Sequence, residues 1–279
     1  MIGLSNGEAR LELRPELGGA IGRFRIGTSE ILRPTPHDAA DPRDCAAFPL
    51  VPFCNRIPRG RFRFEGRDVT LPPNMDRHPH PLHGQGWRAP WRVVELSATA
   101  ATVGFDHPRG DWPWRYSSVQ HVELAPRSVR VSLSVTNLDE TPMPAGLGFH
   151  PYFPRAADQR LKAEVSGVWL ADDEQLPVSR HAGPWRKDWS AGDTVASAVL
   201  IDHCHTDWTG RAELSSGRGS TVVTASANCR WLHIYAPPRE NFLCIEPVGN
   251  MPDPFGGEDR GIVALAPGES LTAWMQIAA

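Results

Sequence analysis

Val129-Arg130-Val131-Ser132-Leu133-Ser134-Val135-Thr136 alternates apolar and polar side chains without a break. Successive side chains of a β-strand point to opposite faces, so this stretch predicts a strand with one face in a core. Val122 and Leu124 precede it across a break at Ala125-Pro126, and the two runs together predict a β-hairpin.

The same period of two recurs from one end of the chain to the other. Further short runs of this kind lie at Leu11/Leu13, Val103/Phe105, Val222/Thr224, Leu232/Ile234, Leu243/Ile245 and Leu271/Ala273/Met275/Ile277. The 27 prolines and 25 glycines fall largely between such runs and leave room for only a few short helices. We therefore predict an all-β protein, a large antiparallel β-sandwich in which residues 1–279 form a single domain. The lack of an internal repeat counts against a propeller.

Composition excludes several classes of protein. Hydrophobic residues make up 41% and charged residues 22% of the chain, which is typical of a globular domain. The net charge of -3 is spread without long charged blocks, so neither a nucleic acid nor a membrane surface is expected as a partner. The five cysteines form no C-x-x-C pair, and no leader or 18-residue apolar stretch is present. These features predict reduced thiols, a cytoplasmic location and either a monomer or a dimer.

Four short polar islands lie in or beside these apolar runs. They are Asn55-Arg56-Ile57, Leu82-His83-Gly84, Gly148-Phe149-His150-Pro151-Tyr152 and Cys244-Ile245-Glu246-Pro247. A β-rich fold can bring an arginine, two imidazoles and a carboxylate from such islands around one small polar ligand. Such a set of groups is suited to proton transfer.

His150 follows a strand-like stretch in which glycine alternates with Leu147 and Phe149. In a strand, Gly146 and Gly148 share a face with His150, so the imidazole is expected beside a surface on which a flat ring could lie. The alternative interpretation is that the glycines mark a bulge and that His150 is an ordinary hydrogen-bonded histidine near the sheet surface.

Glu246 and Arg56 both lie in largely apolar surroundings. A carboxylate there must find partners or raise its pKa, and a base with a tuned pKa is one reason for its presence. The alternative is that Glu246 lies at a strand end beside Pro247 and is exposed to water.

The guanidinium of Arg56 offers a fixed fork of donors for a hydroxyl or ring oxygen. It could equally be a surface arginine whose stem covers apolar area.

The remaining histidines give no zinc motif. His78, His80 and His83 form one cluster, and His203 and His205 flank Cys204, but neither spacing matches a metal site, so none is predicted. His83 stands out because Gly84 and Gly86 allow an unusual turn that presents a side chain. Ten tryptophans exceed what the core needs, and some could line a carbohydrate cleft. Fingerprints of serine hydrolases, P-loop proteins and nicotinamide enzymes are lacking.

Taken in order, these motifs resemble the aldose 1-epimerase (galactose mutarotase-like) family. The similarity runs nearly end to end through Gly18-Gly19-Ala20, Asn55-Arg56-Ile57 with Gly60 and Phe62, the islands above, and Leu265-Ala266-Pro267-Gly268-Glu269-Ser270. The resemblance implies a β-sandwich with a sugar-binding groove, a monosaccharide substrate, and no metal or organic cofactor. One departure is Gln85, where many members of the family have a second glycine after the His-Gly pair.

The resemblance also implies roles for individual residues. Glu246 matches the general base that removes the proton from the anomeric hydroxyl, and His150 matches the general acid that protonates the ring oxygen. Arg56 and His83 match positions that contact the sugar near that oxygen. Asp202 matches a substrate-binding aspartate, with Asp207 as a rival for the same role.

The leading hypothesis is an enzyme, an isomerase that interconverts the α- and β-anomers of a free aldose such as glucose or galactose. A hexose-6-phosphate mutarotase is an alternative, in which Arg59, Arg61 and Arg63 would bind the phosphate. A non-catalytic carbohydrate-binding protein is a second alternative, and the pairing of His150 with Glu246 counts against it. A β-elimination lyase acting on uronic acids finds little support in the near-neutral charge.

Overall fold

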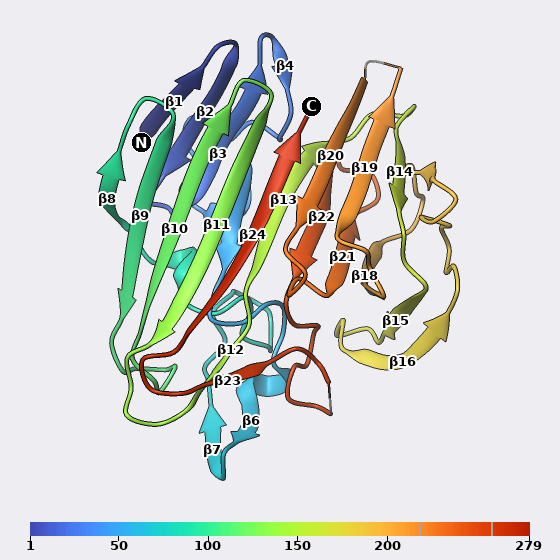
Figure 1. Cartoon of the computed structure of the whole chain (residues 1–279). Coiled ribbons are helices and arrows are strands. Elements are labelled where there is room, and N and C mark those ends of the chain that lie inside the picture. The colour runs from blue at the N-terminus through green and yellow to red at the C-terminus, as the bar shows by residue number, and fades with distance from the viewer. Residues whose placement is uncertain (218, 258) are drawn as a thin grey trace.

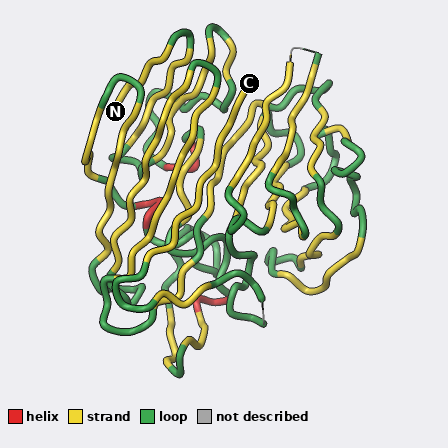
Figure 2. Tube along the Cα trace, viewed as in Figure 1, coloured by secondary structure: helices red, strands yellow, loops and turns green. Residues whose placement is uncertain are grey.

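The computed structural model describes residues 1–217, 219–257 and 259–279. Two large antiparallel sheets lie face to face, as the ribbon in Figure 1 shows, and most of the trace in Figure 2 is strand. Buried side chains from both sheets form the core between them, for example Phe24, Phe153 and Ile245 from one sheet and Val131 and Met275 from the other. The predicted all-β sandwich is thereby confirmed.

Sheet A has eleven strands among the described residues. Its main path runs β1 (Ile2–Asn6), β2 (Ala9–Arg14), β3 (Ala20–Ile26), β5 (Ala47–Leu50), β13 (Gly148–Pro154), β22 (Phe242–Val248), β21 (Trp231–Ala236), β18 (Ile201–Thr206), β15 (Gly167–Ala171) and β16 (Pro177–Ala182), and β4 (Ser29–Glu30) pairs with β3. At the centre of the sheet, β13 from the middle of the chain therefore lies between β5 from its first third and β22 from its last third.

Sheet B has nine strands in the same described ranges. Their order is β17 (Asp193–Thr194), β14 (Arg160–Ala163), β19 (Arg211–Ser216), β20 (Gly219–Ala225), β24 (Ser270–Ala278), β11 (Ser128–Asn137), β10 (Tyr116–Ala125), β9 (Ala100–His107) and β8 (Arg92–Leu96). Two small ribbons join β12 (Met143–Ala145) to β23 (Val263–Leu265) and β6 (Arg61–Phe64) to β7 (Arg67–Thr70).

Helical structure in the described part of the chain is confined to single 3₁₀ turns. They are η1 (Pro42–Asp44), η2 (Pro58–Gly60) and η3 (Gly86–Arg88). None of these turns approaches the length and hydropathy that a membrane-spanning helix needs. All five cysteines are buried and free, as their scattered spacing predicted.

The hairpin predicted from the period of two is present. Strands β10 and β11 pair antiparallel from Tyr116↔Asn137 to Ala125↔Ser128, and the valines and Leu133 of β11 face the core. The face predicted for β20 was wrong, because Val223, rather than Val222 and Thr224, is fully buried. Several small and polar residues surround Val223, so the local pattern did not distinguish the two faces.

The central strands of sheet A are buried on both faces. In β22, Leu243 and Ile245 join the core between the sheets, whereas Cys244 and Val248 join a second apolar cluster on the outer face. Side chains that alternate along a strand point to opposite faces, so Glu246 shares the outer face with Cys244. A polar residue on this covered outer face is held in apolar surroundings without disturbing the main core.

The glycines before His150 do not form an open platform. A Cβ on Gly146 would lie 2.1 Å from Asn250 Oδ1, and a Cβ on Gly148 would lie 2.7 Å from Cys54 Sγ. The strand is therefore packed tightly against these neighbours. The expectation that a flat ring lies on the glycine face was wrong, since protein atoms already occupy that space.

Candidate active site

A pocket of about 530 Å³ opens on the outer face of sheet A. Five adjacent strands contribute to it, with Phe48 from β5, His150 from β13, Glu246 from β22, His233 from β21 and Asp202 from β18. Loops supply the rest of the wall. Among the loop residues are Asn55, Arg56, Met75, Arg77, His78, Leu82, His83, Glu174 and Leu200. Its volume lies in the range of small-molecule sites in proteins.

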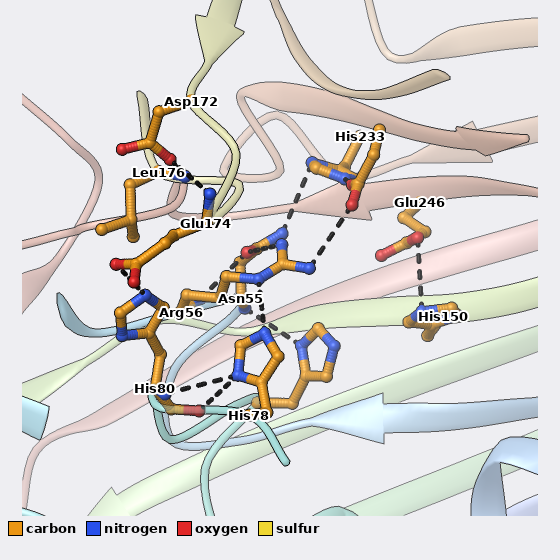
Figure 3. Close-up of polar contacts among 12 residues, drawn as sticks. Asn55, Arg56, His78, His80, His150, Asp172, Glu174, Leu176, His233 and Glu246 are labelled. Atoms are coloured by element: carbon orange, nitrogen blue, oxygen red, sulfur yellow. Dashed lines mark hydrogen bonds and ion pairs between the residues drawn. The ribbon is translucent and has the colours of Figure 1, made fainter. Parts of the chain in front are cut away.

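His150 and Glu246 lie in direct contact within this pocket. Gly148 pairs with Val248 and Tyr152 with Cys244, which places His150 opposite Glu246 on the neighbouring strand. The Nε2 atom of His150 lies 3.3 Å from Oε1 of Glu246, and Figure 3 draws this contact as a dashed line. Glu246 is only 2% exposed, so the interpretation of a strand-end carboxylate in water was wrong.

Burial shifts the pKa values of the two groups in opposite directions. It raises the pKa of Glu246 well above 4.5, with the negative charge of Asp202 acting in the same sense. It lowers the pKa of His150 to about 3, and the charge of His233 adds to this effect. Burial thus disfavours the charged form of both groups and shifts each of them toward its neutral state.

Asp202 is fixed by a second imidazole. Its Oδ1 accepts a hydrogen bond of 2.6 Å from Nε2 of His233, and its Oδ2 lies 3.4 Å from a terminal nitrogen of Arg56. Burial by itself would raise the pKa of Asp202, but the hydrogen bond from His233 and the nearby positive charges outweigh it and lower the pKa below 3.8. Asp202 is therefore ionised and holds the side chains of His233 and Arg56 beside it.

The side chain of Arg56 contacts three neighbours, Asp202, Asn55 and His78. It is therefore not a surface arginine whose stem merely covers apolar area. Its terminal nitrogen donates to Asn55 Oδ1 at 3.0 Å, and its Nε donates to Nε2 of His78 at 3.2 Å. The side chain is 13% exposed. The fork of donors predicted from the sequence is thus oriented by fixed partners, which lowers the entropy lost when it binds a ligand oxygen.

His83 is held in one tautomer by the backbone. The N–H of Asn55 donates to Nδ1 of His83 at 3.0 Å, and the N–H of His83 donates back to the Asn55 carbonyl at 3.0 Å. His83 itself has a φ of 60°, and Gly84 follows with a φ of 74°. Burial, together with the charge of His150, lowers the pKa of His83 well below 6.5. The neutral ring therefore carries its proton on Nε2, where it can donate.

The pocket brings together every residue named for the site from the sequence. His150, Glu246, Arg56, His83 and Asp202 all line it. Asp207, the rival of Asp202, lies in a separate hollow, where it accepts hydrogen bonds from Ser166 and Arg180. The structure therefore places Asp202, and not Asp207, beside the other candidates.

The arginines suggested for a phosphate do not line the pocket. The residues around it do not include Arg59, Arg61 or Arg63, and Arg59 instead pairs with Glu174. Arg61 and Arg63 are exposed on β6, whereas Arg59 lies in the turn η2 and reaches only Glu174 at the pocket wall. That part of the phosphate hypothesis was wrong, although Arg43 and Arg77 do border the pocket.

The sequence predicted no metal site at the clustered histidines, and this remains a prediction. In the structure, His78 and His80 form hydrogen bonds with other protein groups. His78 accepts from Arg56, and Nδ1 of His80 accepts from the backbone N–H of Arg59. A different trio, His150, Cys244 and Glu246, has donor atoms within 4.8 Å of one another. Burial raises the pKa of the Cys244 thiol well above 9.0, which keeps it protonated and a poor metal ligand.

Sequence reasoning missed His233, the cross-strand neighbour of Glu246. The signal was present, because Leu232 and Ile234 mark the core face of that run and so direct His233 to the other face. Sequence reasoning also gave no role to His78, which it treated only as a member of the cluster of His78, His80 and His83. Of the tryptophans, Trp87 borders the pocket, whereas Trp112, Trp114 and Trp189 are core residues.

Two packed antiparallel sheets, with a buried imidazole–carboxylate pair in a pocket on one outer face, define the galactose mutarotase-like class of β-sandwich. The aldose 1-epimerase family model matches residues 1–278. The chain belongs to the aldose 1-epimerase family. Membership of this family implies a sugar epimerase, that is, an isomerase with a mutarotase-type function.

Individual relatives agree with this assignment. The chain is 32% identical to the protein YphB of Escherichia coli (strain K12), over 98% of this chain and 97% of that protein. It superimposes on the structure of a putative aldose 1-epimerase from Escherichia coli K12 with a TM-score of 0.92 at 29% identity, covering 99% and 97% of the two chains. It shares the fold of galactose 1-epimerase from Lactobacillus acidophilus NCFM, with a TM-score of 0.82 at 16% identity and coverage of 98% and 92%.

Proposed function

We propose that this protein catalyses mutarotation, the interconversion of the α- and β-anomers of a free aldose such as glucose or galactose. The observation that carries the proposal is the contact of 3.3 Å between His150 Nε2 and Glu246 Oε1 at the wall of an open pocket. Ring opening of a hemiacetal needs one group to remove the proton from O1 and another to protonate the ring oxygen. Both oxygens are bonded to C1, so a neighbouring base and acid can reach them together.

In the proposed mechanism the pair holds a single proton, which accounts for both steps. Transfer of that proton from Glu246 to His150 leaves a carboxylate base and an imidazolium acid without a change in net charge. The carboxylate takes the O1 proton while His150 gives its proton to the ring oxygen, and the C1–O5 bond breaks to give the aldehyde. After rotation about C1–C2, the reverse transfers close the ring as the other anomer. The high pKa of Glu246 favours its accepting a proton.

Three further residues are proposed to bind the sugar. Neutral His83 offers an Nε2–H, and Arg56 offers guanidinium donors, to the oxygens near C1. Ionised Asp202 accepts hydrogen bonds from sugar hydroxyls, which its contacts with His233 and Arg56 leave room to do. We further propose that residues 1–279 act as one domain, since both sheets take strands from both halves of the chain.

Polarimetry tests the proposed function directly. Freshly dissolved α-D-glucose and α-D-galactose are expected to reach anomeric equilibrium faster in the presence of the purified protein than in buffer alone. A folded protein that gives only the spontaneous rate with both sugars would overturn the proposal. Binding of either sugar without acceleration, measured by calorimetry, would instead identify a carbohydrate-binding protein.

The phosphorylated alternative is tested in the same assay. Arg43 and Arg77 border the pocket, although Arg43 is already paired with Asp41. We expect glucose 6-phosphate to have a kcat/KM no higher than that of glucose, since a phosphate would find only one arginine, Arg77, that has no hydrogen-bonded partner among the described residues. A kcat/KM at least tenfold higher for the phosphorylated sugar would make the hexose-6-phosphate mutarotase the better assignment.

The dependence of the rate on pH follows from the one-proton pair. A second proton can be added only as His150 titrates, and burial lowers the pKa of His150 to about 3, so the acid limb should lie well below 6.5. Loss of the single proton is governed by Glu246, whose pKa is raised, so the alkaline limb should lie well above 4.5. After subtraction of the spontaneous rate, we expect kcat/KM to fall on the acid side only well below pH 6.5. An acid limb centred near 6.5 would contradict the pair as described.

A further inference from the structure

Four side chains at the pocket wall form a closed ring of polar contacts, part of which Figure 3 shows. His233 Nε2 donates to Asp202 Oδ1 at 2.6 Å, and Asp202 Oδ2 lies 3.4 Å from a terminal nitrogen of Arg56. The backbone N–H of Arg56 and its other terminal nitrogen donate to Asn55 Oδ1 at 2.9 and 3.0 Å. Asn55 Nδ2 lies 3.5 Å from Nδ1 of His233 and closes the ring.

Strand register brings His233 to Asp202. Asp202 of β18 pairs with Tyr235 of β21, and Cys204 pairs with His233, so His233 is a diagonal neighbour of Asp202 on the outer face of the sheet. Diagonal neighbours across an antiparallel pair lie about 7–8 Å apart, a distance that long side chains can span. Both residues are buried. A buried carboxylate needs fixed donors in place of water, and His233 makes the shorter of the two contacts.

Both ring nitrogens of His233 already have partners. The ionised Asp202 can only accept, so the proton between the two groups belongs to Nε2 of His233. The oxygen of the Asn55 amide accepts twice from Arg56, so its NH₂ group faces Nδ1 of His233. An imidazole that donates through one nitrogen and accepts through the other has no nitrogen left for a sugar hydroxyl. His233 is thus suited to hold Asp202 rather than to bind the sugar itself.

We propose that His233 is a positioning residue, whose Nε2–H holds the Asp202 carboxylate in the orientation in which its remaining lone pairs accept sugar hydroxyls. The proposal rests on the mutarotase function proposed above, in which Asp202 binds the sugar and His150 and Glu246 transfer protons. His233 acts on sugar binding through Asp202 and takes no part in the proton transfer. Loss of His233 should therefore raise KM more than it lowers kcat.

Two substitutions distinguish the two sides of the His233 ring. The amide of glutamine reaches about as far as Nε2 and can still donate to Asp202, whereas the shorter amide of asparagine reaches only the position of Nδ1. His233→Gln should keep KM within about threefold of the wild type, and His233→Asn should raise KM about tenfold with kcat within about threefold. A wild-type KM for His233→Asn, equal impairment of the two variants, or a loss confined to kcat would overturn the proposal.

A double-mutant cycle shows whether His233 acts through Asp202. Asp202→Asn removes the ionised acceptor that His233 holds, so His233→Asn should change KM by less than about twofold when it is added to Asp202→Asn. Steady-state polarimetry over a range of sugar concentrations gives the four KM values. The same tenfold effect in both backgrounds would show that the two residues act independently, and would overturn the positioning role.

The dependence of KM on pH is a readout that a purely structural role would leave unchanged. Burial raises the pKa of Asp202, and the hydrogen bond from His233 lowers it, so the loss of this bond raises the pKa. KM should therefore begin to increase at a higher pH in His233→Asn than in the wild type as the solution is acidified. The other titratable or charged groups around Asp202 are present in both proteins, namely Arg56, His150, His203, Tyr235, Cys244 and Glu246. Identical profiles of KM against pH would contradict the proposal.

Proton NMR separates this proposal from the proposed function. A buried N–H that donates to a carboxylate at 2.6 Å should give a strongly downfield signal, with or without mutarotase activity. The signal is assigned by its loss in His233→Gln, which lacks the ring, and it should move or vanish in Asp202→Asn. If His233→Asn does not fold, this comparison decides, because a wild type without the signal, or an unchanged signal in Asp202→Asn, would overturn the positioning role. A wild type with the signal but without activity would overturn only the proposed function.

Discussion

Glu246→Gln is expected to lower the kcat of mutarotation by about 10²- to 10⁴-fold, the usual contribution of a positioned acid or base. The amide has nearly the shape of the carboxyl group but cannot accept the proton of O1. Since the carboxyl contacts His150 at 3.3 Å, the change also removes the proton that the pair shares. Initial rates from polarimetry, corrected for spontaneous mutarotation, give kcat and KM for the variant.

The melting temperature of Glu246→Gln shows whether a loss of activity comes from the missing carboxyl group or from unfolding. In the folded protein burial raises the pKa of Glu246 above 4.5, so the native state binds this proton more tightly than the unfolded state. The free energy of unfolding therefore decreases as pH rises through this raised pKa, and a neutral glutamine avoids that loss. At pH values above the raised pKa, the melting temperature of the variant should equal or exceed that of the wild type. Glu123→Gln, on the exposed face of β10, is the matched variant and should keep full activity.

A small effect on the rate would contradict the role given to Glu246. If Glu246→Gln is folded and its kcat falls by less than about threefold, another group must be the base. A large loss of activity with a strongly lowered melting temperature would instead point to a structural role of the carboxyl group.

His150→Asn is the second large effect that we expect, again a loss of about 10²- to 10⁴-fold in kcat. Asparagine retains a hydrogen-bond donor but cannot pass a proton to the ring oxygen at neutral pH. KM should change little because Arg56, His83 and Asp202 remain in place around the sugar. His121→Asn is the matched control, since this exposed histidine lies on β10 and contacts Thr102.

Chemical rescue offers a sharper version of this experiment. His150→Gly leaves the space beside Phe48 and Tyr152 that the imidazole fills in the wild type. Added imidazole should restore part of the rate in a saturable manner, beyond its own catalysis of mutarotation in buffer. Rescue that rises linearly and equals the buffer reaction, together with a wild-type rate for His150→Asn, would contradict the role given to His150.

Local patterns in the sequence predicted the strands and the class of fold. The alternation in residues 129–136 fixed the faces of β11, because the side chains of a strand alternate whatever the tertiary structure. The same rule failed for β20, where small and polar residues on both faces gave no clear contrast and Val223 proved to be the buried one. A sandwich of this kind needs only that most strands have one clearly apolar face.

The candidate site was predictable as a set of residue types but not as a geometry. Glu246 and His150 were recognisable because an ionisable group in an apolar run needs a reason to be there. Their contact depends on the register of β13 against β22, and these strands are separated by nearly a hundred residues. The hydrogen bond between His233 and Asp202 joins two other strands that are distant in the sequence.

The sequence by itself determined the β-sandwich and its resemblance to the aldose epimerases. The chemistry of short segments singled out His150, Glu246, Arg56 and His83 as candidates, and the resemblance alone added Asp202. Only the tertiary structure decided which side chains touch. It buried Glu246 and His150 in contact with each other, placed Asp202 rather than Asp207 in the same pocket, left Arg59 out of the pocket lining, and packed His150 against Phe48 and Tyr152. The physical reason is that burial, electrostatic coupling and stacking depend on distances between segments that only strand register and sheet packing establish.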